Sequence, residues 1–210
     1  MDQGLSVVAS IEARMSSSRL PGKVLADVRS FPALTRLVRR LRFCTSLDGI
    51  VLATSDNRAD DPLIEWAEYE GVEFFRGSED DVLSRVVGAH IMMGSDVIVE
   101  VTGDSILSDP SVIDMGVDIY MNGDFDVVSN TWNVSYPMGV DVQVFGFDIL
   151  NRLNDQILDE SFREHVSLYF YEHPETYKIC HLMAPKHLRA PEYRFQLDYV
   201  EDLKFVNEIY

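Results

Sequence analysis

The chain has 210 residues, of which 46% are hydrophobic and 25% charged, and this composition excludes a disordered tail or a small disulfide-stabilised protein. Its length favours a single domain spanning 1–210. Every apolar run is shorter than the roughly 18 residues that a membrane span needs, so we expect no membrane insertion. The start Met1–Gly4 lacks the basic residues and apolar stretch of a signal peptide, and we therefore expect a cytoplasmic protein.

Charge and cysteine content exclude further classes of protein. The chain carries 18 basic and 35 acidic residues, a net charge of −17, which argues against nucleic-acid binding. Cys44 and Cys180 lie 136 positions apart among apolar residues, which is typical of reduced, buried thiols rather than of disulfides or a cysteine metal site. The basic residues concentrate in 14–42, a window with a net charge of +7. Four of them suit the solvated face of a helix: Arg36, Arg39, Arg40 and Arg42.

Strand and helix patterns alternate along the first part of the chain. Apolar runs of strand length predict strands at 5–11, 50–53, 72–75 and 97–101. Helical spacing and capping residues predict helices that begin at Pro32, Asp61, Val82 and Asp109. The alternation predicts an α/β fold of three layers, in which a mostly parallel, doubly wound, Rossmann-like sheet lies between helices. A ligand of such a sheet binds at the carboxyl ends of the strands.

The pattern changes at about Thr131, and we expect residues 131–180 to form a small β/α excursion, either a subdomain or a dimer arm. A turn at 136–139 precedes a predicted strand at 140–144 and predicted helices at 148–158 and 161–173. Strands near 177–183 and 194–197 follow. The last predicted helix opens beyond Asp198 and is still running at Tyr210, so we expect the natural chain to continue.

The segment 12–23, EARMSSSRLPGK, directly follows the first predicted strand. Its serines and Pro-Gly turn would let backbone N–H groups curl around an anion, which Arg14, Arg19 and Lys23 would neutralise, as in a triphosphate site. The segment matches neither the Walker pattern G-x-x-x-x-G-K-[ST] nor the Rossmann pattern G-x-G-x-x-G. A basic loop without a ligand fits the same residues, so composition alone leaves both interpretations open.

This segment resembles the nucleotide-binding signature of the cytidylyltransferases that make CMP-activated sugars, and most closely that of the spore coat polysaccharide biosynthesis protein F family. The resemblance runs nearly end to end and implies a fold of the nucleotide-diphospho-sugar transferase type. One departure is Ile106, where the family usually has proline. The motifs that carry the resemblance are 13–25, VLATSD at 51–56, FRGSEDDVL at 75–83, TGD at 102–104, Tyr136-Pro137 through Asp141-Val142, REHV at 163–166, Leu197-Asp198 and Glu201-Asp202-Leu203.

The resemblance implies an enzyme that transfers CMP from CTP to a sugar acid or a sugar phosphate with release of pyrophosphate, in surface or spore coat polysaccharide biosynthesis. It makes Arg14, Lys23 and Asp104 the catalytic residues, with the two cations stabilising the departing pyrophosphate. It also places a Mg²⁺ cofactor on Asp104 and Asp198. Without the resemblance, Asp104 is equally well a turn residue and Asp198 a helix cap.

Further roles follow from the resemblance. Residues 131–180 would hold the acceptor and form a homodimer. Arg163 would bind a carboxylate or phosphate, although a surface ion pair with Glu164 is an equally good interpretation. The implied nucleotide-binding residues are Ala13, Arg14, Ser16, Ser17, Ser18, Arg19, Lys23, Arg76 and Ser78, and the implied acceptor-binding residues are Tyr136, Gly139, Asp141, Arg163 and His165.

Three other functions remain open at this point. A transferase of the same fold would use another nucleoside triphosphate, and a glycosyltransferase would consume a sugar nucleotide. Asp124-Phe125-Asp126 has the D-x-D form of a glycosyltransferase metal site, but it precedes a strand-like segment instead of following one. A nucleotide-binding scaffold without turnover is the third possibility. The product of the reaction distinguishes the enzymes, whereas thermal stabilisation by CTP and Mg²⁺ without pyrophosphate would indicate the scaffold.

Overall fold

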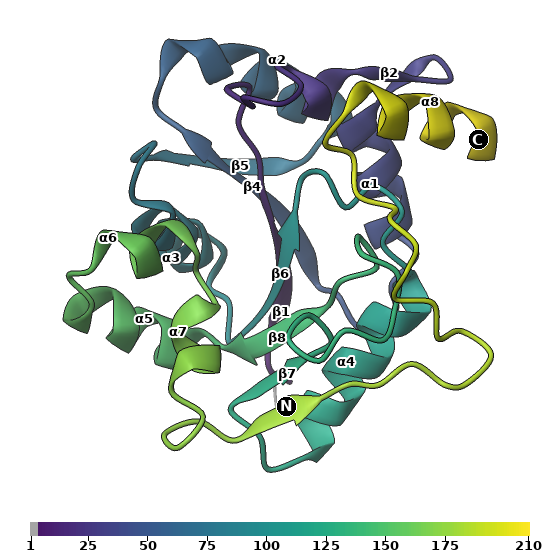
Figure 1. The fold of residues 1–210 in the computed structure, drawn as a ribbon. Helices are drawn as coiled ribbons and strands as arrows, with labels where there is room; N and C mark the ends of the chain where they lie inside the picture. Colours follow the sequence, from purple (N-terminus) through teal and green to yellow (C-terminus); the bar gives the residue numbers. More distant parts are fainter. Residues whose placement is uncertain (1–3) are drawn as a thin grey trace.

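A seven-stranded sheet forms the centre of the computed structural model, which describes residues 4–210 (Figure 1). Residues 1–3, on which the expectation of no signal peptide partly rests, lie outside that range. From edge to edge the strands are β5 (Glu73–Gly77), β4 (Gly49–Ser55), β1 (Val7–Glu12), β6 (Val97–Thr102), β8 (Gln143–Gly146), β7 (Val127–Ser129) and β9 (Ile179–His181).

The sheet is mostly parallel, as predicted. β5, β4, β1 and β6 run parallel to one another, and β7 pairs in parallel with β9. β8 is antiparallel to both β6 and β7. Because β8 lies between β6 and β7, the segment 131–180 is partly built into the main sheet.

Helices cover both faces of the sheet and complete three layers (Figure 1). Their apolar sides form two hydrophobic clusters, one on each face of the sheet. The predicted three-layer α/β architecture is therefore confirmed. One face carries α1 (Ala33–Leu41), α2 (Asp61–Glu70), α4 (Pro110–Asn122) and α8 (Val200–Ile209), and the other carries α3 (Val82–Met93), α5 (Phe147–Gln156), α6 (Glu160–Glu164) and α7 (Leu168–Glu172).

Local sequence sets the ends of these helices. The Asp81 side chain accepts a hydrogen bond from the Ser84 N–H and caps α3, and Asp109 caps α4 ahead of Pro110 in the same way. α2 and α3 end at Gly71 and Gly94, whose φ angles of 64° and 65° lie in the left-handed region. The helix starts predicted at Asp61, Val82 and Asp109 thus lie within one residue of those in the structure.

Strand register brings together two turns that are distant in sequence. Glu12, the last residue of β1, pairs with Thr102, the last residue of β6. The chain then turns at Gly103, whose N–H donates to the Glu12 carbonyl at 2.9 Å. A Cβ atom at Gly103 would lie 2.9 Å from the Ala13 Cβ, so only glycine allows this close approach. The loop after β1 and the turn before Asp104 are consequently neighbours.

Two predicted elements differ from the structure. The helix predicted over 161–173 is two short helices, α6 and α7, separated by the turn 165–167. The strand predicted at 194–197 is absent from the seven-stranded sheet. This segment forms a single parallel bridge between Met138 and Arg194, and Leu197 N–H donates to the carbonyl of Asp104 at 2.9 Å. The segment 194–197 therefore pairs with the loops that contain Met138 and Asp104 instead of joining the sheet.

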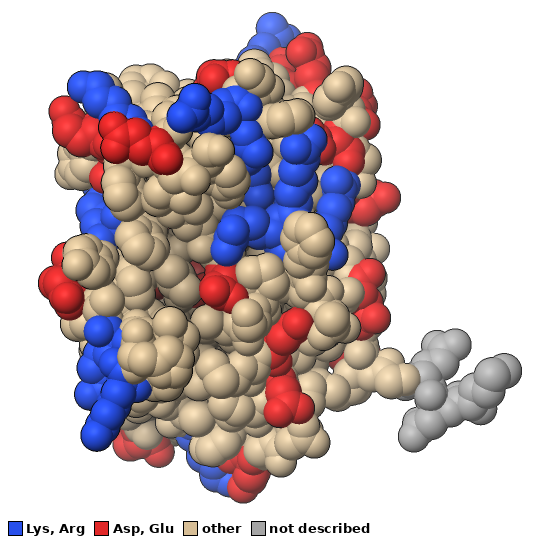
Figure 2. Space-filling view, turned by 90° about the vertical axis from the view of Figure 1, so that its right-hand side faces the viewer, with Lys and Arg blue, Asp and Glu red and all other residues tan. Residues whose placement is uncertain are grey.

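The distribution of surface charge and the state of the two cysteines agree with what the sequence predicts. Figure 2, viewed from the side of α1 and α8, shows basic side chains grouped in the upper half of this face, with acidic side chains around them. On α1, Arg36 and Arg39 stack over the Phe31 ring, with the guanidinium carbons 4.8 and 3.8 Å from its centroid. Cys44 and Cys180 are free and partly buried. Within residues 4–210, no helix is both long and apolar enough to cross a membrane.

Candidate active site

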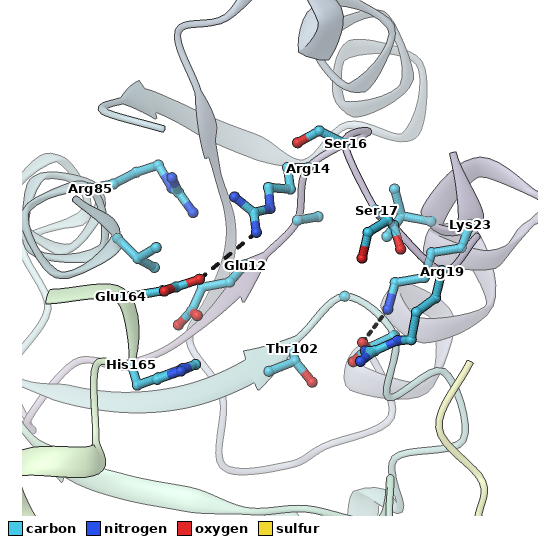
Figure 3. Close-up of a pocket in the computed structure, with 16 residues that line it drawn as sticks. Glu12, Arg14, Ser16, Ser17, Arg19, Lys23, Arg85, Thr102, Glu164 and His165 are labelled. Atoms are coloured by element: carbon cyan, nitrogen blue, oxygen red, sulfur yellow. Dashed lines mark hydrogen bonds and ion pairs between the residues drawn. The ribbon is translucent and has the colours of Figure 1, made fainter. Parts of the chain in front are cut away.

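A cavity of about 490 Å³ opens at the carboxyl ends of β1 and β6, where the fold predicts a ligand. One end of it is formed by the loop after β1 and the other by residues of α3 and α6 (Figure 3). Its walls are largely polar and carry charges of both signs. The lining residues are Glu12, Ala13, Arg14, Ser16, Ser17, Ser18, Arg19, Lys23, Val24, Val82, Arg85, Thr102, Gly103, Asp104, Glu164 and His165.

The loop 13–23 is held in shape by its own backbone and by one buried acid. The Met15 carbonyl accepts hydrogen bonds from the N–H groups of Ser17 and Gly22, at 2.9 and 3.0 Å. Gly22 has a φ of 70°, which favours glycine, and leads into a short 3-10 helix at Lys23–Leu25. The Met15 N–H donates to Asp60, a residue only 1% exposed, at 2.7 Å. This anchoring leaves the serines and cations of the loop facing the cavity (Figure 3).

Lys23 joins this loop to the two predicted metal-binding carboxylates. Its Nζ atom lies 2.5 Å from an oxygen of Asp104 and 2.7 Å from an oxygen of Asp198. The side chains of all three residues are at most 13% exposed. The basic loop and the two aspartates, 81 and 175 positions apart from Lys23 in sequence, therefore meet at one point.

Asp198 is surrounded by cations. Besides Lys23, it accepts hydrogen bonds from Arg19, at 2.5 Å, and from Arg194. Burial raises the pKa of Asp198, but the hydrogen bonds from Lys23, Arg19 and Arg194 outweigh burial and lower the pKa to about 2. The carboxylate is thus fully ionised at neutral pH, as a ligand of a hard cation must be.

The chemistry of this pair fits a divalent cation. Carboxylates of Asp104 and Asp198 converge on the Lys23 ammonium, so a cation near that position would contact both. Their hard oxygens suit Mg²⁺, which usually takes one or two protein carboxylates and completes its shell with water and phosphate oxygens. Within residues 4–210, no group of three or more His, Cys, Asp and Glu residues could hold a metal. A bound nucleotide would therefore have to supply ligands.

The opposite end of the cavity is formed by Glu12, Arg85, Glu164 and His165 (Figure 3). Arg14 lies between the two ends, with a guanidinium nitrogen 4.0 Å from a Glu164 oxygen. Arg85 is 3% exposed and donates to the carbonyl of Ser78 at 2.6 Å. Burial raises the pKa of Glu12 to about 7, with the Arg85 charge acting to lower it and the Asp104 charge to raise it.

Comparison with known proteins assigns the chain to a family. The family model described as cytidylyltransferase matches residues 8–210. The chain belongs to the cytidylyltransferase family. The spore coat polysaccharide biosynthesis protein SpsF of Bacillus subtilis is 36% identical over 95% of this chain and 84% of that protein. A cytidylyltransferase from Leptospira borgpetersenii has a structure that superposes with a TM-score of 0.90, at 30% identity, over 97% of this chain and 85% of that one.

More distant solved structures share the fold of this chain. A CMP:2-keto-3-deoxy-manno-octonic acid synthetase in complex with CTP has a TM-score of 0.68 at 16% identity, over 97% of this chain and 98% of that one. The Rv0371c protein of Mycobacterium tuberculosis, in complex with manganese, has a TM-score of 0.66 at 13% identity with the same coverage. A nucleotidyltransferase fold is thus shown for the chain, and a divalent metal is present in one relative of that fold.

Two residues that the family resemblance assigns to the nucleotide lie outside the cavity. Arg76 donates to the carbonyls of Ser55 and Asn57, at 3.0 and 2.8 Å, and pairs with Asp61 at 2.7 Å. Ser78 Oγ accepts a hydrogen bond from the Asp81 N–H at 3.1 Å. In this chain both side chains brace the loops around β5, and their contact with the nucleotide stays a prediction.

The predicted acceptor-binding residues are dispersed. Of the five, His165 alone lines the described cavity. Arg163 is bound to Asp81 at 2.7 Å and to backbone carbonyls of Asn154 and Ile157, which places it in a neighbouring pocket. The surface pairing weighed for Arg163 therefore involves Asp81, and Glu164 instead approaches Arg14.

Tyr136, Gly139 and Asp141 do not line the described cavity. Tyr136 is 4% exposed. Gly139 has a φ of 93°, and a Cβ there would lie 2.7 Å from the Gln196 nitrogen. Gln196 in turn donates to Asp104 at 3.1 Å. Burial raises the pKa of Asp141 to about 6, opposed by a hydrogen bond from the Gly139 N–H and reinforced by the Asp104 charge.

Three charged residues that line the cavity escaped the sequence-based assignment. Glu12 is the first residue of the segment that carries the family signature. A single acid at the end of a strand gives no sign in the sequence that it lines a binding site. Arg85 occurs in an apolar helix between Leu83 and Val86, and a charged residue at such a buried position is the only signal that marks it. Glu164 forms part of the REHV motif, where we had considered it only as a partner of Arg163.

Proposed function

We propose that this chain transfers CMP from CTP to a sugar acid or a sugar phosphate and releases pyrophosphate, with Mg²⁺ as cofactor, in the synthesis of a surface or spore coat polysaccharide. The observation that carries the proposal is the contact of Lys23, from the basic loop, with both Asp104 and Asp198. The name of the Bacillus subtilis relative supports the polysaccharide role, and the CTP complex of a protein with the same fold supports the nucleotide.

Positioning and charge neutralisation account for most of the catalysis in such a transfer. Backbone N–H groups of the serine-rich loop would bind the phosphates, with Arg14 and Lys23 neutralising the departing pyrophosphate and Arg19 supporting the loop. Asp104 and Asp198 would hold Mg²⁺, which when bound draws charge from the phosphate oxygens. The acceptor oxygen would attack the α-phosphorus opposite the bond to pyrophosphate.

We place the acceptor against the part of the cavity wall that the nucleotide would leave free. With the phosphates on the basic loop, the free end of the cavity at Glu12, Arg85 and His165 is the place for the sugar (Figure 3). Arg85 supplies a cation for an acceptor carboxylate or phosphate. His165 is the predicted acceptor residue that this assignment retains.

A homodimer through residues 131–180 is part of the proposal. Several large apolar side chains of this segment are exposed, including Trp132 at 51% and Leu158 at 91%. Burial of such side chains is a common source of dimer stability. Light scattering at micromolar concentration should give twice the chain mass, and a monomer would refute this part of the proposal.

The structure gives no support to a glycosyltransferase metal site at Asp124-Phe125-Asp126. The Asp124 side chain is 94% exposed and pairs with Lys178 at 2.7 Å. Asp126 accepts a hydrogen bond from the Lys178 N–H at 2.8 Å. These acids lie outside the cavity lining and before β7.

The deciding experiment measures pyrophosphate release with CTP, UTP, ATP and GTP against a panel of 2-keto sugar acids and sugar phosphates. We expect release with CTP and one acceptor class, dependent on Mg²⁺ and abolished by EDTA. Preference for another nucleotide would point to a related nucleotidyltransferase. Free nucleotide released from a sugar nucleotide would indicate a glycosyltransferase. Thermal stabilisation by CTP and Mg²⁺ without pyrophosphate from any acceptor would indicate a scaffold.

A further inference from the structure

Glu12 lies at the proposed acceptor end of the cavity, near Glu164 and His165 and opposite Lys23 of the basic loop (Figure 3). It is the last residue of β1, two positions before Arg14. Its backbone carbonyl is hydrogen-bonded to the Gly103 N–H, which fixes the strand end against the turn that carries Asp104. The Glu12 carboxyl is therefore held on rigid backbone, on the wall of the same cavity in which we propose that the basic loop binds the phosphates.

The other carboxyls on the cavity wall are already engaged. Asp104 is bound by Lys23 at 2.5 Å and by Gln196 at 3.1 Å. Glu164 is 57% exposed and faces Arg14. In contrast, Glu12 Oε1 is buried and has no hydrogen-bond partner among residues 4–210. A buried carboxyl without a partner is costly unless a ligand or a proton satisfies it.

The surroundings of Glu12 favour a carboxyl that exchanges a proton near neutral pH. The charged and titratable groups around it are Arg85 of α3, Glu100 of β6, Asp104, Arg14, and Glu164 and His165 at the end of α6. Burial raises the pKa of Glu12 to about 7, the range in which a general base works best.

Glu100 provides a second buried carboxyl close to Glu12. Strand register pairs Ser10 with Glu100 and Glu12 with Thr102, so Glu12 and Glu100 lie diagonally on the same face of the sheet. Glu100 is 6% exposed, and its Oε2 has no partner among the described residues. Burial raises the pKa of Glu100, and the charge of Glu12 raises it further. Two such acids disfavour a phosphate dianion beside them and favour a group that donates a proton.

We propose that Glu12 is the general base of the transfer and that the acceptor attacks through a hydroxyl group, not through a phosphate oxygen. This inference rests on the proposed function. A phosphate oxygen is already ionised and needs no base, whereas a hydroxyl must lose its proton. The carboxylate takes that proton as the acceptor oxygen bonds to the α-phosphorus. The bond to the bridging oxygen breaks, and pyrophosphate leaves with the electron pair. The proton on Glu12 then returns to solvent.

The test compares Glu12→Gln with the control Glu100→Gln, which alters the same buried pair without changing the cavity wall. With CTP, Mg²⁺ and the hydroxyl acceptor that the wild type uses, Glu12→Gln should lower kcat by about 10²–10⁴-fold and leave the Kd for CTP unchanged. Glu12→Asp keeps a titrating carboxyl and should recover part of the rate. Glu100→Gln should stay within about tenfold of the wild type.

A pH profile separates a base from a structural residue. The wild-type kcat should fall about fivefold between pH 7 and pH 6, because a base with a pKa of about 7 becomes protonated, and Glu12→Gln should lose this dependence. Equal rates and equal pH profiles for the two proteins would overturn the inference and leave the proposed function intact. So would a wild type that uses a sugar phosphate as its preferred acceptor.

A readout without turnover completes the test. Infrared difference spectra of the wild type, with Glu12→Gln as the reference, should show a carboxyl band that titrates near neutral pH. A band that titrates below about pH 5, near the ordinary glutamate value, would overturn the inference. Absence of pyrophosphate with every acceptor would instead refute the proposed function, and the assignment of a base would fall with it.

Discussion

Replacement of Lys23 by alanine removes the cation that, among residues 4–210, contacts both Asp104 and Asp198. Those carboxylates would keep other partners, since Gln196 still donates to Asp104, and Arg194 still donates to Asp198. We therefore expect a loss of stability of about 1–3 kcal/mol, which is less than the roughly 3–5 kcal/mol for a buried charge left without any partner. The variant should fold.

The effect on turnover should be larger than the effect on stability. Loss of one preorganised electrostatic partner of the reacting phosphates commonly lowers kcat by about 10²–10³-fold, or roughly 2.7–4 kcal/mol of transition-state stabilisation. Lys23→Met keeps the apolar stem and should lose the same activity with less loss of stability. Lys186→Ala, at an exposed position, is the matched control.

The assay pairs pyrophosphate release from CTP with urea unfolding followed by circular dichroism. Turnover of purified Lys23→Ala at the wild-type rate would refute the placement of the leaving group on the basic loop. Equal activity losses for Lys186→Ala and Lys23→Ala would also refute it, because the effect would then not depend on the contact with the two aspartates.

Three further predictions concern the carboxylates and a buried histidine. Asp104→Ala should nearly abolish pyrophosphate release with circular dichroism unchanged, and a rate that still rises with Mg²⁺ concentration would argue against metal binding there. Because the pKa of Asp198 is lowered to about 2, its stabilising effect of about 2 kcal/mol should be complete above pH 4 and lost between pH 4 and 2. Urea titrations of wild type and Asp198→Asn should therefore converge on acidification. Burial lowers the pKa of His90 to about 3, so on acidification the histidine is protonated first in the unfolded chain. The free energy of unfolding should therefore fall by on the order of 3–5 kcal/mol between pH 6.5 and pH 3, and His90→Gln should reduce this dependence on pH.

Much of the fold was predictable because its signals are local. Strand-length apolar runs and cap residues such as Asp109 specify where elements begin, and alternation of strand and helix specifies a parallel sheet. The two missed elements depend on distant partners. The break at 165–167 has no Gly or Pro, and there the Ser167 hydroxyl donates to Gln143 of β8 at 2.8 Å. The segment 194–197 pairs with Met138 and Asp104, which no local pattern reveals.

The candidate site was predictable where motif and topology agree. The basic loop follows β1, and Asp104 follows β6, so adjacency of these strands brings them together. The sequence could not show whether Arg76 binds the nucleotide or the protein itself. An arginine in a motif reads the same whether its guanidinium binds a phosphate or, as here, three oxygens of the chain. The sequence could not identify Glu12 as a site residue, because its burial and its lack of a hydrogen-bond partner arise only in the folded chain.

The ammonium of Lys23 acts as a built-in counter-ion for Asp104 and Asp198. This contact offsets the charges of the two carboxylates within the chain, so we expect the fold not to require a metal. Chelation should leave the melting temperature unchanged while stopping turnover. The same ammonium would compete with a divalent ion for these two carboxylates, so we expect metal and nucleotide to bind as a preformed complex whose phosphates would take over the contact with Lys23.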